Sequence, residues 1–474
     1  MKILYETSES SPWIASGGLG DVAGSLPKAI SQFGIQCCVV LPFYSKIDEN
    51  LRPLIEYVTH FDLAFDGGIQ YCGIFTAYYN DVRYYFIDNM HFFARENIYG
   101  YLDDNRRFGF FCKAVLEMLL HIDFAPDIIH CNDWQTGLIP VFLDVFFREI
   151  EKFTTIKTLF TIHNIAYQGN FDFYHCDQFL RLPDYANDWI TWNGCVNYMK
   201  AAITRSNQVN TVSNRYAQEI QYSWFGCGLD TLLSENKEKL SGILNGIDTV
   251  HYNPYTDCYL ASPLEKDILD YKNANKTKLQ QQFGLEEGQD KLIISIVSRL
   301  VAAKGMDLVI HVLEELLNTH WHIQIVLLGC GDFVYEQFFR ELQMRFPSRV
   351  GIKFGFIPKL STPVYAGSDL LLMPSLSEPC GLSQMIALRY GTIPVVHLTG
   401  GLADSIRDVG EVDGNGYTFQ RINAHDMLNS ILRAEKDFHN KNLWYARVAH
   451  ALQCNFSWNY SANAYKQLYD SMLF

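Results

Sequence analysis

Two short apolar runs between Leu370 and Asp404 constrain the fold more than any other part of the sequence. Leu370–Met373 is short and apolar throughout, which indicates a strand buried on both faces rather than an amphipathic element, and Ile393–Val396 repeats the pattern. Strands buried on both faces occur in parallel sheets covered by helices. The stretch therefore predicts an α/β fold.

Polar residues follow the first of these runs. Glu378 comes shortly after the run and Gly381 lies close behind it, while Pro379 is expected in the first turn of the next helix. Ligands of open α/β sheets bind outside the carboxyl ends of the strands. We therefore expect the Glu378 carboxylate and the backbone N–H groups near Gly381 to lie where a ligand binds at the edge of the sheet. An ordinary turn with Glu378 as a solvated cap is the alternative.

A glycine turn follows the second run. Thr399-Gly400-Gly401 leads into a helix that is predicted to begin at Leu402. The turn is expected to offer free N–H groups at the positive end of that helix, an arrangement that suits a diphosphate.

Composition limits the other classes of function. A chain of 474 residues predicts two large domains. Its formal net charge of −14 argues against nucleic acid or an anionic membrane as the main partner. No apolar run approaches the roughly 18 residues of a membrane span, and Glu6 interrupts any secretory signal. Oligomeric state is not predictable from these features.

Cysteine usage indicates a reducing compartment. The twelve cysteines form no CxxC pair, and several lie inside apolar runs such as the one containing Cys37 and Cys38. We expect reduced core cysteines and a cytoplasmic protein. No metal site is expected, because no cluster of Asp, His or Cys shows suitable spacing.

The first half contains further apolar runs with polar ends. The predicted strands are Lys2–Tyr5, Gln36–Pro42, Pro126–Cys131, Thr158–Ile162 and Gln208–Ser213. After the first strand comes the glycine-rich loop Ser16–Asp21, which is neither a P-loop nor a dinucleotide fingerprint, and a helix is expected from about Val22. The segment after Pro42, up to about residue 90, is predicted to be less regular.

The second half begins with another apolar strand. A polar, proline-marked stretch indicates a domain boundary near residue 250, and Leu292–Val297 is the first strand beyond it. Arg299 and Lys304 follow that strand and suit a diphosphate, although two ordinary surface cations are the alternative. Strands are also predicted at Ile323–Leu328 and Gly351–Phe356. The turn after Ile323–Leu328 lacks the third glycine of a dehydrogenase fingerprint.

Several motifs together resemble one known family. SEPCGLSQMIALRYGTIPVV and TGGLAD, with SGGLGDV, NDWQ, HNIAYQG and SRLVAAKG elsewhere, resemble the signatures of bacterial glycogen synthases and plant starch synthases, glycosyltransferase family 5. The resemblance covers nearly the whole chain. It implies the GT-B fold, in which two Rossmann-like domains face a central cleft. The implied parts are an acceptor-side catalytic domain at 1–249, a nucleotide-sugar-binding domain at 250–455, and a final helix at 456–474 that crosses back to the first domain.

The resemblance also implies a reaction. The family transfers glucose from ADP-glucose to the non-reducing end of an α-1,4-glucan, glycogen or starch, with retention of configuration and without a metal or other cofactor. By analogy, Arg299 and Lys304 would meet the departing diphosphate and Glu378 would hold glucose hydroxyls. The backbone of His163 would lie against the anomeric carbon. Since no second carboxylate is placed as a nucleophile, a front-face route is implied.

Further substrate-binding positions are implied only by matching motifs. They are Glu9, Gly17, Gly18, Asp21, Asp133, Trp134, Asn164, Asn245, Gly329, Phe356, Cys380, Gly381, Leu382, Thr399, Gly400 and Gly401.

The sequence departs from the family pattern in several places around these motifs. Ala15 stands where the family has a lysine, and Asn132 and Gln135 replace two histidines. Ala303 replaces a glutamine, and Ile357-Pro358-Lys359 stands where acidic residues are usual. Two alternatives therefore stay open. One is a related retaining transferase that uses UDP-glucose or another donor. The other is a catalytically weakened paralogue that binds glucan or nucleotide as a regulatory protein.

Overall fold

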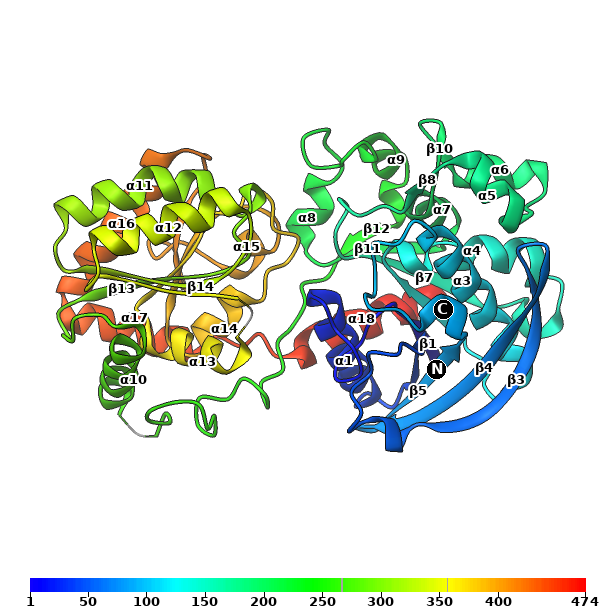
Figure 1. Ribbon diagram of the computed structural model, residues 1–474, viewed down its shortest axis with the longest axis horizontal. Helices are drawn as coiled ribbons and strands as arrows, with labels where there is room; N and C mark the ends of the chain where they lie inside the picture. Colours follow the sequence, from blue (N-terminus) through cyan, green and yellow to red (C-terminus); the bar gives the residue numbers. More distant parts are fainter. Residues whose placement is uncertain (266, 356) are drawn as a thin grey trace. The chain divides into compact units, whose positions relative to one another are not determined.

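Two compact units make up the protein. The computed structural model describes residues 1–265, 267–355 and 357–474. Contacts divide the chain into one unit of Met1–Gly246 with Trp458–Phe474 and a second unit of Ile247–Ser457. Each unit contains a largely parallel sheet with helices on both faces (Figure 1), as the α/β prediction requires.

The first unit is built on a nine-stranded sheet with the order β12-β11-β7-β6-β1-β2-β5-β4-β3. Its strands are β1 (Lys2–Glu6), β2 (Gln36–Pro42), β3 (Glu56–Phe65), β4 (Gly68–Tyr79), β5 (Val82–Asp88), β6 (Ile128–Asn132), β7 (Lys157–Ile162), β11 (Gln208–Thr211) and β12 (Leu240–Gly242). The central strand β1 pairs in parallel with β2 and β6. A small separate sheet contains β8 (Asn170–Phe171), β9 (Thr191–Trp192) and β10 (Cys195–Asn197).

The prediction of an irregular segment after Pro42 is wrong. Strands β3, β4 and β5 form an antiparallel extension of the sheet there. The turns between them, Asp66-Gly67 and Asn80-Asp81, have positive φ at both central residues, as tight hairpin turns require. In β3, Phe61, Leu63 and Phe65 are buried while the residues between them are exposed, which is the alternation of a strand with one solvated face.

Helices cover both faces of this sheet. The helices of the first unit are α1 (Gly18–Ser31), α2 (Met90–Phe93), α3 (Asp104–His121), α4 (Ile139–Phe142), α5 (Phe173–Leu180), α6 (Asp184–Ile190), α7 (Tyr198–Arg205), α8 (Asn214–Glu219), α9 (Asp230–Glu235) and α18 (Trp458–Leu473). One apolar core forms between the sheet and α1 with α18, and another forms against α3, α4 and α7. Helix α1 begins at Gly18 and not near Val22 as predicted, since the glycines belong to its first turn.

Helix α18 comes from the end of the chain and completes the first unit. Its side chains Tyr465 and Tyr469 are fully buried against the sheet. Asn210 Nδ2 donates to Tyr465 Oη at 3.1 Å, and Tyr469 Oη lies 2.8 Å from His130 Nδ1. The helix therefore joins the core of the first unit by both packing and hydrogen bonds.

The second unit has a six-stranded parallel sheet with the order β15-β14-β13-β16-β17-β18. Its strands are β13 (Leu292–Val297), β14 (Ile323–Gly329), β15 (Val350–Phe354), β16 (Leu370–Met373), β17 (Ile393–His397) and β18 (Tyr417–Phe419). The predictions for β13 and β16 are confirmed to the residue. The predicted strand to Phe356 ends at Phe354, and Phe356 lies outside the described residues.

The helices of the second unit also cover both faces. They are α10 (Ile268–Phe283), α11 (Met306–Thr319), α12 (Phe333–Arg345), α13 (Pro358–Gly367), α14 (Ser383–Arg389), α15 (Gly400–Ser405), α16 (Ala424–His439) and α17 (Lys441–Gln453). Helices α11, α12 and α16 pack on one face, and α10 and α13 pack on the other (Figure 1).

Two general features bear on the predictions from composition. None of the helices in the described residues combines the length and the apolar character needed to cross a membrane. All twelve cysteines are free, and seven of them are buried.

Candidate active site

An ion pair stands at the carboxyl edge of the second sheet. Lys304 Nζ lies 2.5 Å from Glu378 Oε2, and Ser375 Oγ donates to the same oxygen at 2.9 Å. Glu378 follows β16 and is buried, whereas the Lys304 side chain, after β13, keeps about a fifth of its surface exposed. Because Glu378 is buried and paired, the alternative of a solvated cap is wrong.

Close backbone contacts fix the loops that carry this pair. A Cβ added at Gly305 would lie 2.0 Å from the carbonyl oxygen of Pro374, and Gly305 has a φ of +74° that disfavours other residues. The N–H of Leu376 also donates to the carbonyl of Ala303 at 2.9 Å. The loop after β13 is thus held against the loop after β16, which fixes the distance between the lysine and the carboxylate.

Arg299 lies beside this pair in sequence but makes no such contact. Its side chain is exposed, and its guanidinium forms no hydrogen bond or ion pair with the part of the chain that the structure describes. The neighbouring Gly329, at the end of β14, approaches so closely that a Cβ would lie 1.9 Å from the carbonyl oxygen of Ser298. A cation is therefore available at an edge where two strands end.

The loop after β16 differs in one respect from the prediction. Helix α14 begins at Ser383 after Leu382, so Pro379 lies in the loop and not in the first turn of a helix. Gly381 has a φ of +72°, and the Cys380 side chain beside it is buried. The extra residues let the loop bend back toward the glycine turn after β17.

The glycine turn is packed tightly on that loop. A Cβ at Gly400 would lie 2.0 Å from the carbonyl oxygen of Glu378, and one at Gly401 would lie 2.1 Å from that of Cys380. Both positions need glycine because no side-chain atom fits there.

The prediction that this turn offers free N–H groups is wrong for most of its residues. The N–H of Gly401 donates to the Glu378 carbonyl at 3.0 Å, and that of Leu402 donates to Thr399 at 3.0 Å. The short helix α15 begins at Gly400, not at Leu402. The Gly401 donor therefore holds the turn to the neighbouring loop, and the Leu402 donor closes the turn on itself. The sequence could not show an acceptor on another loop.

His163 stands at the carboxyl end of β7 in the first unit, where its neighbour Asn132 fixes its imidazole. Asn132 Nδ2 donates to the backbone carbonyls of Glu6, at 2.9 Å, and His130, so its Oδ1 is the acceptor. That oxygen accepts from Tyr5 Oη at 3.0 Å and lies 2.9 Å from His163 Nε2, which must therefore carry the proton. Burial lowers the pKa of His163 to about 3, so the ring is neutral near pH 7. The role of Asn132 was missed from the sequence.

Asp133 also holds the His163 segment. It has an unusual positive φ of 56°, and its Oδ1 accepts from the N–H of His163 at 2.7 Å. Burial raises the pKa of Asp133 to about 7, although hydrogen bonds from the backbone of His163 and Asn164 act in the opposite direction. Asn164 Oδ1 in turn accepts from the N–H of Ala166 at 3.0 Å.

Trp134 is largely committed to packing. Its ring lies 5.1 Å from that of Phe108 and 5.6 Å from that of Phe171, between centroids. A Cβ at Gly169 would lie 2.5 Å from the indole. Only the remaining exposed part of the ring is available to a ligand.

The glycine-rich loop of the first unit has an open surface. A Cβ at Gly17 or Gly18 would meet no atom of the described part of the chain within 4 Å, while the N–H of Ser16 donates to the carboxylate of Glu9. Burial is the main cause that raises the pKa of Glu9. The loop is anchored at the glutamate and exposed at the glycines. Asp21, one turn into α1, is also exposed.

Asn245, near the end of the first unit's main segment, is buried, and its Oδ1 has no hydrogen-bond partner among the described residues. An unpaired buried oxygen of this kind is suited to a ligand hydroxyl.

Sequence and structure comparisons place the chain among known proteins. Residues 2–235 match the starch synthase catalytic domain, and residues 277–446 match glycosyl transferases group 1. A glycogen synthase of Bacillus anthracis is 44% identical over 100% of both chains, and one of Geobacillus thermodenitrificans is 43% identical over 100% of this chain and 98% of its own. The chain belongs to the glycogen and starch synthase family.

A solved structure of this family agrees with the fold. The catalytic domain of starch synthase IV from Arabidopsis thaliana, bound to ADP and acarbose, has a TM-score of 0.90, 32% identity and 99% coverage of both chains. The family and the GT-B fold that the motifs imply are thereby confirmed. The roles of single residues in this family member stay predictions. The structure brings together Lys304, Glu378 and Ser375 in one unit, and His163, Asn132 and Asp133 in the other.

Proposed function

We propose that the protein transfers glucose from ADP-glucose to the non-reducing end of an α-1,4-glucan, glycogen or starch, with retention of configuration. Full-length similarity to glycogen synthases supports the reaction. A related starch synthase bound to ADP and acarbose supports a nucleotide donor and a glucan acceptor.

The observation that carries the proposal is the arrangement of Lys304, Glu378 and Arg299 at the carboxyl edge of the second sheet. Departure of ADP leaves negative charge on its diphosphate, and fixed cations stabilise that charge most when they are preorganised. Arg299 has a planar guanidinium, unpaired among the residues that the structure describes, for bidentate contact, and Lys304 is held as a point charge. Glu378, oriented by Ser375, accepts hydrogen bonds from glucose hydroxyls.

The second unit is thus the nucleotide-sugar-binding part, with Gly329, Cys380, Gly381, Leu382 and the turn Thr399-Gly400-Gly401 shaping its edge. Most N–H groups of that turn already donate hydrogen bonds within the protein. Its glycines therefore let the ligand approach the backbone closely, and they contribute less to anion binding. Arg299 and Lys304 then stabilise most of the negative charge on the diphosphate.

The first unit supplies the acceptor side. Asp133 and Asn132 hold His163 in place. The backbone of His163 is the part assigned to the contact with the anomeric carbon. Glu9, the open glycines Gly17 and Gly18, and Asn245 offer polar contacts for sugar hydroxyls. In a front-face route the bond from C1 to the phosphate oxygen breaks as the acceptor hydroxyl attacks on the same face. The hydroxyl proton passes to the departing diphosphate.

The twelve free cysteines support a cytoplasmic location as part of the same proposal.

One assay tests the proposal against its alternatives. Purified protein is incubated with glycogen and either ADP-glucose or UDP-glucose, and both nucleotide release and polymer growth are followed. Growth with ADP-glucose is expected. Growth with UDP-glucose alone would overturn the donor assignment, and no growth with either donor, together with retained glucan binding, would favour a regulatory protein.

A further inference from the structure

A second group of polar side chains lies at the opposite end of the second sheet. His322 directly precedes β14, whose carboxyl end is Gly329 at the candidate active site. Seven residues of strand span roughly 20 Å at about 3.3 Å per residue, so the two places are well separated. Glu435 and His439 come from the last turns of α16, which packs over the same end of the sheet.

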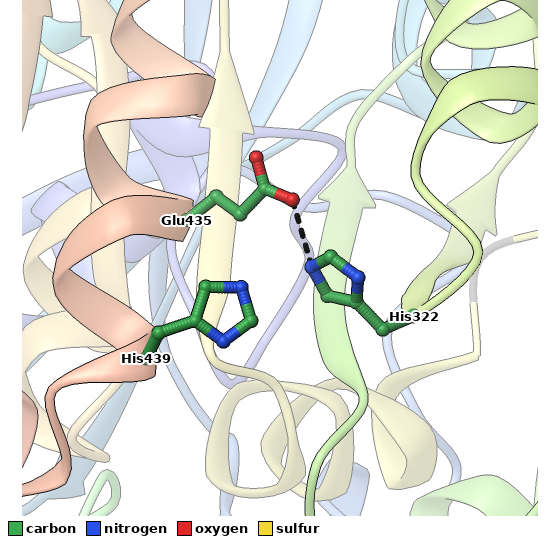
Figure 2. Close-up of side chains that lie close together, drawn as sticks. All are labelled: His322, Glu435 and His439. Carbon is green, nitrogen blue, oxygen red and sulfur yellow. Dashed lines mark ion pairs between the residues drawn. The ribbon is translucent and has the colours of Figure 1, made fainter.

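The three side chains converge on one point, as Figure 2 shows. Glu435 and His439 are four residues apart on α16 and therefore project from the same face of the helix. His322 Nε2 lies 2.7 Å from Glu435 Oε1, and the rings of His322 and His439 are 4.8 Å apart between centroids. One nitrogen or oxygen atom from each of the three residues lies within 4.8 Å of the other two.

An ordinary ion pair accounts poorly for this group. His320 Nδ1 also lies 2.6 Å from Glu435 Oε1, so three imidazoles surround one carboxylate, which can balance one positive charge. Although His322 Nε2 lies close to Glu435, this buried nitrogen has no well-directed hydrogen bond to any of the residues that the structure describes.

We propose that His322, Glu435 and His439 form a binding site for a divalent transition-metal ion, with Zn²⁺ the best match. Two imidazole nitrogens and one carboxylate oxygen are a common three-residue zinc ligand set, with water in the fourth position. Zinc bonds are about 2.0–2.2 Å long, which places ligand atoms within roughly 3.5 Å of one another. Because the His439 side chain is exposed, a rotation of its ring can bring its ligand nitrogen from within 4.8 Å to a zinc-bonding distance. His320, whose Nδ1 contacts the Glu435 carboxylate, is a positioning residue that orients this ligand.

Such an ion would join α16 to the segment that leads into β14. These elements are distant in sequence and belong to the same core. The site would therefore stabilise the second unit without taking part in glucosyl transfer.

Metal binding to the full-length protein tests the site directly. The protein is dialysed against EDTA, freed of the chelator, and titrated with Co²⁺, whose visible absorption reports coordination by nitrogen and oxygen ligands, and with Zn²⁺ by calorimetry. One ion per chain is expected, with a rise in the melting temperature. His439→Ala should weaken binding at least about 10- to 100-fold, as loss of even an outer partner does.

The matched control is His425→Ala, which removes an exposed histidine from the first turn of the same helix. It should bind the ion as the parent does. Because His439 is exposed, His439→Ala should fold and melt as the metal-free parent does, without the rise on adding Zn²⁺. Failure of the parent to bind either ion, or equal binding by His439→Ala, would overturn the site. Neither result depends on glucosyl transfer.

Discussion

Lys304 has two tasks at the level of single residues. Its ammonium group neutralises the buried carboxylate of Glu378, and the same charge is available to a diphosphate at the sheet edge. Ser375 also donates to Glu378, so we expect the carboxylate to keep one partner when the lysine is removed. Arg299 has no comparable structural task, since its guanidinium is unpaired among the described residues. Loss of either cation should therefore affect the reaction more than the fold.

Removal of these cations provides the first prediction. Lys304→Ala and Arg299→Ala should each lower the rate of glucosyl transfer by about 10²–10³-fold, the usual loss for one preorganised charge-stabilising group. Circular dichroism should remain that of the parent. Lys278→Ala, an exposed lysine on α10, is the control and should keep the parent's rate. Near-parental transfer by Arg299→Ala or Lys304→Ala would remove that residue from the diphosphate site.

The glycine-rich loop gives a second prediction, because Ala15 is exposed beside the open glycines. If the loop closes on the donor, Ala15→Lys should raise activity with ADP-glucose by at most about 10²–10³-fold through an added phosphate contact. Ala15→Gln has nearly the same length without the charge and should give no such gain. Steady-state rates with ADP-glucose compare the three proteins. Equal rates for lysine and glutamine would mean that another cation already serves the diphosphate.

Helix α18 shows how much one element contributes to a distant part of the chain. It is the last helix in the sequence, yet Tyr465 and Tyr469 are fully buried in the core of the first unit. Tyr469 adds a hydrogen bond to His130, which is itself buried. The element therefore stabilises a sheet formed mainly by the first half of the chain.

Substitutions in α18 should separate packing from hydrogen bonding. Tyr469→Ala is expected to destabilise the first unit by about 3–5 kcal/mol, the typical cost of removing a large buried aromatic ring. Tyr469→Phe should cost about 1–3 kcal/mol, because it leaves a buried polar nitrogen without its partner. Tyr460→Ala, at a position that is 78% exposed on the same helix, is the control. Urea unfolding measures all three, and parental stability of Tyr469→Ala would contradict the core role of the helix.

The success of the sequence-based prediction varied with the type of element. Strands β13 and β16 were predicted to the residue because both faces are covered, which makes their sequences continuously apolar. Strand β3 was missed because it has a solvated face, although the Asp66-Gly67 turn between β3 and β4 was an available hairpin signal. Strand β5 was missed even though Tyr84, Tyr85, Phe86 and Ile87 are buried on both faces.

The same limit applies to the candidate site. Motifs located Lys304 and Glu378, but their 2.5 Å contact depends on the packing of two loops through Gly305. The group of His322, Glu435 and His439 was missed because its members are far apart in the chain and meet only when α16 packs on the sheet. The local sequence shows which functional groups lie at the edge of a sheet. Residues from other loops and helices determine which of these groups already have a hydrogen-bond or ion-pair partner in the folded protein.

At the level of the whole molecule, the reaction and the proposed metal site should respond differently to chelation. The cations assigned to the diphosphate are Arg299 and Lys304. The proposed metal site of His322, Glu435 and His439 lies at the other end of the second sheet. Dialysis against EDTA should leave the transfer rate unchanged at temperatures well below melting. The melting temperature should fall if the protein carries the ion when purified. A rate that only added Mg²⁺ or Mn²⁺ restores would contradict the assignment of the diphosphate to the two cations.

The chain enters the second unit after Gly246 and returns to the first at Trp458, so the second unit is an insertion within the first. Because a ribosome releases the chain from its N-terminus, the apolar face that receives Tyr465 and Tyr469 stays uncovered until α18 has been synthesised, after the whole second unit. The first unit therefore begins before the second unit and is completed after it. A message truncated anywhere upstream of α18 would yield a first unit with an open core, a target for chaperones and proteases, even when every strand of both sheets had been made.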